Sequence, residues 1–194
     1  MSACRTGLVV CLLALTGCSV RSPPADYWTL AATAPRPAAW HDAPAVAIGA
    51  VELPRYLDRP QVMLRLGAGR LEPASLHRWA DPLDDAFGRA LAEELARRLA
   101  SRRVSAYPVA PAGRPDYRLR VDVERFDGRP GEAVELIARW VLAGADGEQL
   151  AVERVDLRVP AEGGIDGFVA AHSAAVAQLA GQIATRIEAS VAGN

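Results

Sequence analysis

Alternating apolar and polar residues in the second half of the chain constrain its fold more than any other feature. Residues 117–124 place Tyr, Leu and Val on one side of an extended strand and Arg, Asp and Glu on the other. Residues 134–142 repeat the pattern, and Asp146-Gly147 is a favourable hairpin turn into residues 149–159. Because side chains alternate between the two faces of a strand, each segment predicts a strand with one buried face. Together the three segments predict an antiparallel meander.

Two amphipathic segments predict long helices. The first begins at Asp81-Pro82, where we expect Asp81 to cap the amino end and Pro82 to take the first helical position. Leu or Phe then recurs at four-residue spacing over residues 83–99, which gives this helix one apolar stripe. A second helix is expected over residues 165–191, with His172 on its apolar line.

Shorter apolar runs predict the remaining strands, at residues 27–30, 45–53, 61–66, 70–73 and 104–109. Both faces of the run at 45–53 are apolar, so we expect a central strand that is covered on both sides. The order of strands, helix, strands, helix predicts an α+β fold, with a mostly antiparallel or mixed sheet and two long helices packed on one face. We expect residues 27–194 to form a single domain of this kind.

The sequence offers few groups for catalysis or for metal binding. All three cysteines lie within the first 18 residues, and none of the three histidines has a partner at catalytic or metal-ligand spacing. We expect His172 to be a partly buried structural residue. The pairs Asp84-Asp85 and Glu93-Glu94 are expected on the exposed face of the first helix, where Glu93 and Glu94 would pair with Arg97 and Arg98. We therefore expect no enzyme, no cofactor and no bound metal.

The charge of the chain also narrows its possible partners. The formal net charge is −1, with 22 basic and 23 acidic residues. A chain this close to neutral lacks the broad basic surface on which nucleic-acid binding depends. We therefore expect no nucleic acid among its partners.

The amino terminus has the organisation of a secretory signal peptide. Arg5 supplies a basic start, residues 7–14 are an apolar stretch, and small residues follow. The segment ends in Leu15-Thr16-Gly17-Cys18. This sequence resembles the bacterial lipobox, in which the cysteine is alkylated by diacylglycerol, the signal is cut just before it and the new amine is usually acylated.

The lipobox resemblance defines the expected processing of the chain. Residues 1–17 would be a lipoprotein signal peptide, Cys18 the lipidated first residue of the mature protein, and residues 18–26 a short tether. Outer-membrane lipids would hold the protein through Cys18. The resemblance also implies delivery to the outer membrane, because Ser19 stands where an aspartate retains many Gram-negative lipoproteins at the inner membrane.

Two further segments resemble the signature of the PqiC/YmbA-type lipoproteins. They are Tyr56-Leu57-Asp58-Arg59-Pro60-Gln61-Val62 and Arg78-Trp79-Ala80-Asp81-Pro82-Leu83. The resemblance implies a periplasm-facing, outer-membrane auxiliary lipoprotein that docks the distal end of an MCE-domain, PqiB-like tunnel. Such assemblies move lipid between membranes and support envelope integrity. A homo-oligomeric ring is a further implication, because MCE tunnels are rings.

Two interpretations of the motif residues stay open. In one, Asp58-Arg59-Pro60 is a rigid turn in which Arg59 holds a neighbouring loop, and Trp79 covers the base of the first helix. In the other, the motifs form the surface that binds a partner, since aromatic residues and arginine dominate protein interfaces. The residues of this candidate interface are Tyr56, Leu57, Asp58, Arg59, Pro60, Arg78 and Trp79.

Two other functions compete with the docking role. A stand-alone lipid-binding or outer-membrane assembly lipoprotein would require a deep apolar cavity. A periplasmic hydrolase would require a cluster of polar catalytic groups, and the sequence shows no motif for one.

Overall fold

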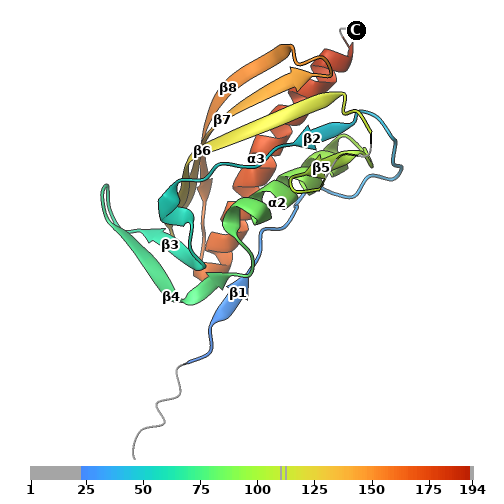
Figure 1. Ribbon diagram of the computed structural model, residues 1–194. Helices are drawn as coiled ribbons and strands as arrows, with labels where there is room; N and C mark the ends of the chain where they lie inside the picture. Colours follow the sequence, from blue (N-terminus) through green and yellow to red (C-terminus); the bar gives the residue numbers. More distant parts are fainter. Residues whose placement is uncertain (1–22, 110, 112, 193–194) are drawn as a thin grey trace, which may run out of the picture.

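The computed structural model describes residues 23–109, 111 and 113–192. The predicted signal peptide, Cys18 and the first part of the tether lie outside these residues. In the described part of the chain, eight strands form one mixed sheet that two long helices cover (Figure 1). The predicted α+β fold is confirmed.

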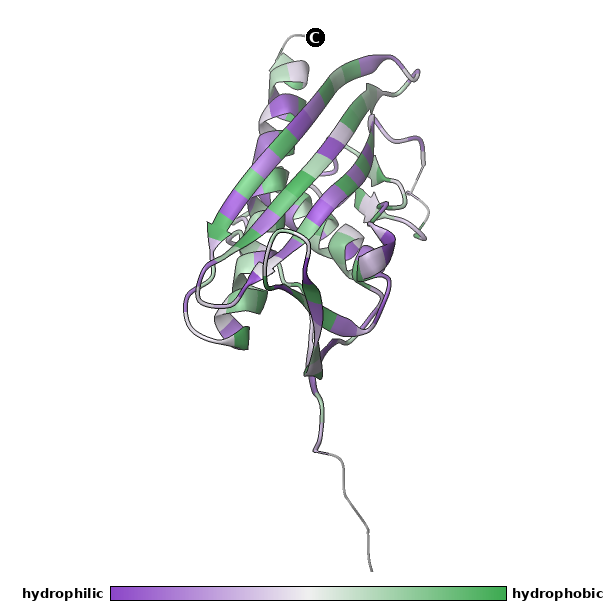
Figure 2. Cartoon of the chain, turned by 90° about the vertical axis from the view of Figure 1, so that its left-hand side faces the viewer, coloured by the Kyte–Doolittle hydropathy of each residue, from purple (hydrophilic) through white to green (hydrophobic). Residues whose placement is uncertain are grey.

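The antiparallel meander is present and forms the largest part of the sheet. Its strands are β6 (Tyr117–Arg129), β7 (Ala133–Gly144) and β8 (Gln149–Pro160). Gly147 closes the β7–β8 turn with a φ of +92°, a conformation that favours glycine. The alternation of the sequence appears as bands of colour across these strands in Figure 2.

The shorter strands extend the sheet along the other side of β6. They are β1 (Asp26–Trp28), β2 (Val46–Ile48), β3 (Gln61–Arg65), β4 (Leu71–Trp79) and β5 (Val104–Ala106). β2 lies between β5 and the first residues of β6 and is parallel to both. β3 meets the far end of β6 at Gly128, pairs with β4 in antiparallel fashion, and β4 in turn pairs with β1.

The helices α2 (Leu83–Arg98) and α3 (Ile165–Ala192) pack against each other, and α3 lies across β7 and β8. Their apolar stripes and the inward side chains of the sheet make one continuous core. The largest fully buried side chains are aromatic: Phe87, Phe126, Trp140 and Phe168. Burying an aromatic side chain stabilises the fold by about 1.5–3 kcal/mol, so this core is the main source of stability.

The predicted start of the first helix is wrong by one residue. Pro82, with φ −49° and ψ 131°, precedes the first helical residue Leu83, and its carbonyl accepts a 2.9 Å hydrogen bond from the amide of Ala86. Asp81 is therefore one position too early to cap the helix. Its Oδ2 instead accepts a 2.5 Å bond from Nη2 of Arg89.

Several predicted strands differ in length from the structure, and the run at 104–109 forms only the short strand β5. The run at 45–53 forms only the short strand β2, in which the outward residue Ala47 is half-buried, and Gly49 and Ala50 just after the strand are exposed. The expected cover on both faces is therefore absent there. The predicted strand at 70–73 is part of a longer one, because β4 continues to Trp79.

The exposed position predicted for Glu94 is wrong. Glu94 is fully buried, and its Oε1 accepts hydrogen bonds from the amide and hydroxyl of Thr33 and, at 3.1 Å, from the amide of Ala34. Its Oε2 lies 3.3 Å from Nε of Arg98. The neighbouring pair is as expected, with 2.8 Å between Glu93 and Arg97. Glu94 thus fastens the segment after β1 to α2.

Candidate functional site

The two sequence motifs meet in space. The first forms the short 3₁₀ helix η1 (Arg55–Leu57) and the turn into β3, and the second ends β4. The amide of Trp79 donates a 2.6 Å hydrogen bond to the carbonyl of Pro60, and Gln61 pairs with Arg78. The two motifs are neighbours because β3 pairs with β4.

A surface pocket of about 660 Å³ separates η1 from the start of α2, and we call it the motif pocket. Apolar groups form its base, and charged groups of both signs surround them. Its lining residues are Val51, Glu52, Leu53, Arg55, Leu57, Asp58, Arg59, Pro60, Trp79, Asp81, Pro82, Leu83 and Asp84.

The candidate interface residues divide into buried and exposed groups. Leu57 and Trp79 are only 3% and 4% exposed. Asp58, Arg59 and Pro60 are exposed at the rim of the motif pocket. Each of the two sequence interpretations therefore fits a different part of the motif.

Neither Arg59 nor Arg78 is seen to hold a neighbouring loop in place within the described part of the chain. The guanidinium of Arg59 makes no hydrogen bond or ion pair with another described residue. Arg78 is half-buried, does not line the motif pocket, and its Nε has no hydrogen-bond partner among the described residues. No contact between described residues supports the interpretation in which Arg59 holds a neighbouring loop.

Tyr56 takes part in a buried charge network that sequence analysis missed. Its hydroxyl donates a 2.5 Å hydrogen bond to Oδ2 of Asp127, a fully buried carboxylate on β6. Arg65 donates to both oxygens of Asp127, at 2.5 and 2.7 Å, and Arg125 donates to Oδ1 at 3.0 Å. Bidentate pairs of this kind are strong and directional. The network therefore fixes η1 against β3 and β6.

The network sets the ionisation of its members. Burial, together with the hydrogen bond to Asp127, raises the pKa of Tyr56 to about 12. The Asp127 hydrogen bond also raises the pKa of Arg65, although burial opposes it. Burial alone would raise the pKa of Asp127, but hydrogen bonds from Arg65, Tyr56 and Arg125 outweigh that effect and lower it. Asp127 is therefore a carboxylate and Tyr56 a neutral phenol at neutral pH.

His172 lies behind the motif pocket in an aromatic cage. Its ring packs edge-on against Trp79, Phe126 and Phe168, with centroid distances of 5.5, 4.7 and 4.5 Å. Nδ1 lies 2.8 Å from the carbonyl of Phe168. Burial lowers the pKa of His172 to about 4, so the ring is neutral at neutral pH. The structural role expected for His172 is confirmed, and its burial is complete rather than partial.

The site has the features of a binding surface. No group of three or more His, Cys, Asp or Glu in the described residues is arranged to hold a metal ion. Among these residues, no helix has the length and apolar composition needed to cross a membrane. Exposed Asp58 and Arg59 at the rim, above the apolar base, can bind a partner segment that carries both apolar and charged side chains.

No sequence signal identified Asp127 or Arg65 as important. The two residues are 62 positions apart, and the register of β6 shifts between Val123 and Arg125. That shift interrupts the strict alternation, so the position of Asp127 could not be read from the pattern alone.

Comparison with known proteins agrees with this fold. A crystal structure of an uncharacterised protein has a TM-score of 0.70 at 23% identity, covering 85% of this chain and 99% of the other. A DUF330-family protein from Xanthomonas campestris has a TM-score of 0.68 at 18% identity, covering 86% and 99%. No curated protein matches the sequence significantly.

A family model assigns the chain more directly. The model describes an ABC-type transport auxiliary lipoprotein component and matches residues 28–184, from β1 through most of α3. The match includes both motifs, the motif pocket and the whole meander. The chain therefore belongs to the family of ABC-type transport auxiliary lipoprotein components.

Proposed function

We propose that this protein is a PqiC/YmbA-type auxiliary subunit of an MCE-type intermembrane lipid transport system. Acylated Cys18 anchors it to the periplasmic face of the outer membrane, where it docks the distal end of the MCE-domain tunnel. The family supplies the broader statement, a membrane-associated transport auxiliary lipoprotein. The narrower role rests on the two motifs and the surface they form.

The motif pocket is the observation that carries the proposal. Two segments about 20 positions apart converge on one surface, and the exposed rim of that surface is charged while its base is apolar. Interfaces usually combine an apolar centre with a polar rim. Asp58, Arg59 and Pro60 are free to contact a partner, whereas Leu57 and Trp79 support the surface from beneath.

The proposal is tested by capture from native envelopes. The tagged, acylated protein is recovered in mild detergent, and mass spectrometry identifies the proteins that accompany it. We expect an MCE-domain protein, and we expect Arg59→Ala to lose it. Arg139→Ala is the matched control, because Arg139 is also an exposed arginine but lies on the outer face of β7. Equal recovery by both variants would refute this docking surface.

A second candidate function is a stand-alone lipid-binding or outer-membrane assembly lipoprotein. A groove of about 680 Å³ on the outer side of β2 and β5 favours it, within the range typical of small-molecule sites. Ala47, Tyr107, Val109 and Val141 are among the residues that line this groove. Recovery of the protein alone, with a stoichiometric lipid, would support this function over docking.

A further inference from the structure

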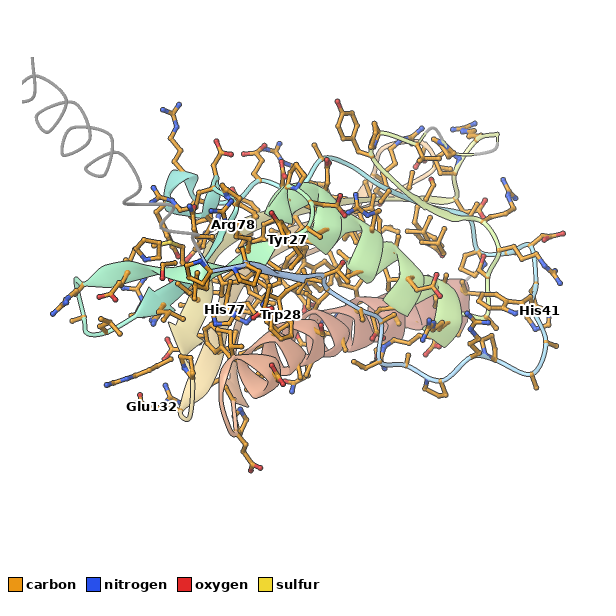
Figure 3. All side chains as sticks on the ribbon, turned by 90° about the horizontal axis from the view of Figure 1, so that it is seen from below. Tyr27, Trp28, His41, His77, Arg78 and Glu132 are labelled. Atoms are coloured by element: carbon orange, nitrogen blue, oxygen red, sulfur yellow. The ribbon has the colours of Figure 1, made fainter. Side chains whose placement is uncertain are left out.

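Tyr27, Leu76 and Arg78 share one surface at the end of the molecule where the described chain begins. β1 is parallel to the end of β4, with Tyr27 beside Arg78 (Figure 3). The next pair in the register is Trp28 with Trp79. Trp28 and Trp79 pack in or against the core, so their strand neighbours Tyr27 and Arg78 lie on the opposite face. Leu76 lies in the irregular part of β4, where the register with β3 shifts, and it is exposed two residues before Arg78. We call these three residues the β1–β4 surface.

Two side chains of this surface expose apolar area to solvent. Tyr27 is 64% exposed and Leu76 is 39% exposed. Arg78 is half-buried beside Tyr27, and its guanidinium makes no ion pair with another described residue. A planar guanidinium in this position can bind a phosphate oxygen from a neighbouring molecule.

The length of the tether limits what the surface can meet. Tyr27 is nine positions after Cys18. A flexible chain of that length spans about 15–18 Å on average, and even a fully extended one reaches only about 30 Å. The β1–β4 surface therefore stays within a short distance of the bilayer that holds the acyl chains.

We propose that the β1–β4 surface lies in the headgroup region of that bilayer. This inference rests on the proposed acylation of Cys18 and adds a second contact to it. Tyrosine places an apolar ring and a polar hydroxyl in that region, Leu76 adds apolar area, and Arg78 binds lipid phosphate. Arg78 does not line the motif pocket, and in this arrangement its partner is lipid rather than a docked protein.

The contact would also orient the domain. The last turns of α3 lie at the end of the molecule opposite β1 (Figure 1). α3 has 28 residues, and at 1.5 Å per residue it is about 42 Å long. With the β1–β4 surface on the membrane, the far end of α3 extends into the periplasm.

Site-specific fluorescence tests this arrangement. All cysteines of the chain lie at or before residue 18, so one cysteine added to the acylated mature protein is a unique free thiol. Tyr27→Cys and Leu76→Cys are labelled with an environment-sensitive dye and bound to phosphatidylethanolamine–phosphatidylglycerol vesicles. Val191→Cys is the control, because Val191 is exposed near the far end of α3.

We expect the labels at 27 and 76 to shift to shorter wavelength and to lose fluorescence to lipids spin-labelled near the headgroup, while the label at 191 does neither. Labels at 27 and 76 that behave like the one at 191 would overturn the inference. Shielding that arises only when an MCE-domain protein is added would also overturn it, because the occupant would then be a protein.

A fatty-acid labelling control separates this inference from the proposed function. If Cys18 takes up no fatty acid, the anchor itself fails and the membrane contact fails with it. If the protein is acylated and recovers its MCE-domain partner, but the labels at 27 and 76 remain in water, only the membrane contact is refuted.

Discussion

Removing the buried carboxylate of Asp127 is the most direct test of how the motif surface is held. Asp127→Ala leaves Arg65, Arg125 and the Tyr56 hydroxyl without their shared acceptor. Breaking a buried ion pair costs about 3–5 kcal/mol. We expect about 3 kcal/mol, the lower end of that range, because Arg65 is 19% exposed and can regain water. For a domain of this size that corresponds to a fall in Tm of about 6–12 °C.

Urea unfolding followed by tryptophan fluorescence measures the loss. Glu124→Ala is the control, because Glu124 also pairs with an arginine, Arg154, at 3.0 Å but does so in solvent, which screens the pair. Its urea midpoint should change little. If Asp127→Ala costs no more than Glu124→Ala, the network does not hold η1 in place and the reasoning is wrong.

The same network predicts how acid affects stability. The pKa of Asp127 is lower in the folded protein than in the unfolded chain. Its contribution is therefore complete above the unfolded value of about 3.9 and is lost as the pH falls through the folded pKa. In Asp127→Ala, this part of the acid sensitivity should disappear from a series of urea midpoints measured against pH.

Three further predictions concern other parts of the chain. His172 has a folded pKa of about 4, so below about pH 6.5 the unfolded chain binds a proton that the folded protein excludes. The free energy of unfolding should therefore fall as the pH drops from about 6.5 toward 4. Urea midpoints of His172→Gln should depend less on pH over that range. Gly128→Ala would place its Cβ 2.0 Å from the carbonyl oxygen of Ala133 and should lower Tm, whereas Gly69→Ala, which meets no atom within 4 Å, should have little effect. Cys18→Ala should abolish incorporation of labelled fatty acid, and persistent labelling would contradict the lipobox interpretation.

Local sequence patterns predicted the elements whose packing is also local. The meander over residues 117–159 and the last helix could be read from alternation and helical spacing, because sequence neighbours pair or share a face there. The parallel partners of β2 could not be predicted, because its strand pairs lie about 60 to 70 positions away. Such contacts leave no periodic signal in either segment.

The candidate site was predicted only in part, for a related reason. The motifs identified the segments that line the pocket, but not which side chains point into it. Glu94 was placed on the exposed face because its partners, Thr33 and Ala34, are about 60 positions away. Asp127 was missed because it lies beyond the alternating residues 117–124, after the register shift in β6. Its charge can be buried there because Arg65 pairs with it.

The division of the motif into buried and exposed residues decides which variants can report on function. Leu57 and Trp79 belong to the core, so truncating either creates a cavity that costs about 2–5 kcal/mol. Loss of a partner in those variants would follow from local unfolding and would say nothing about contact. Arg59 has no such structural contact among the described residues, so its substitution leaves the fold intact while changing the rim. A docking role for the motifs therefore depends on the exposed residues Asp58, Arg59 and Pro60, and not on the buried Trp79.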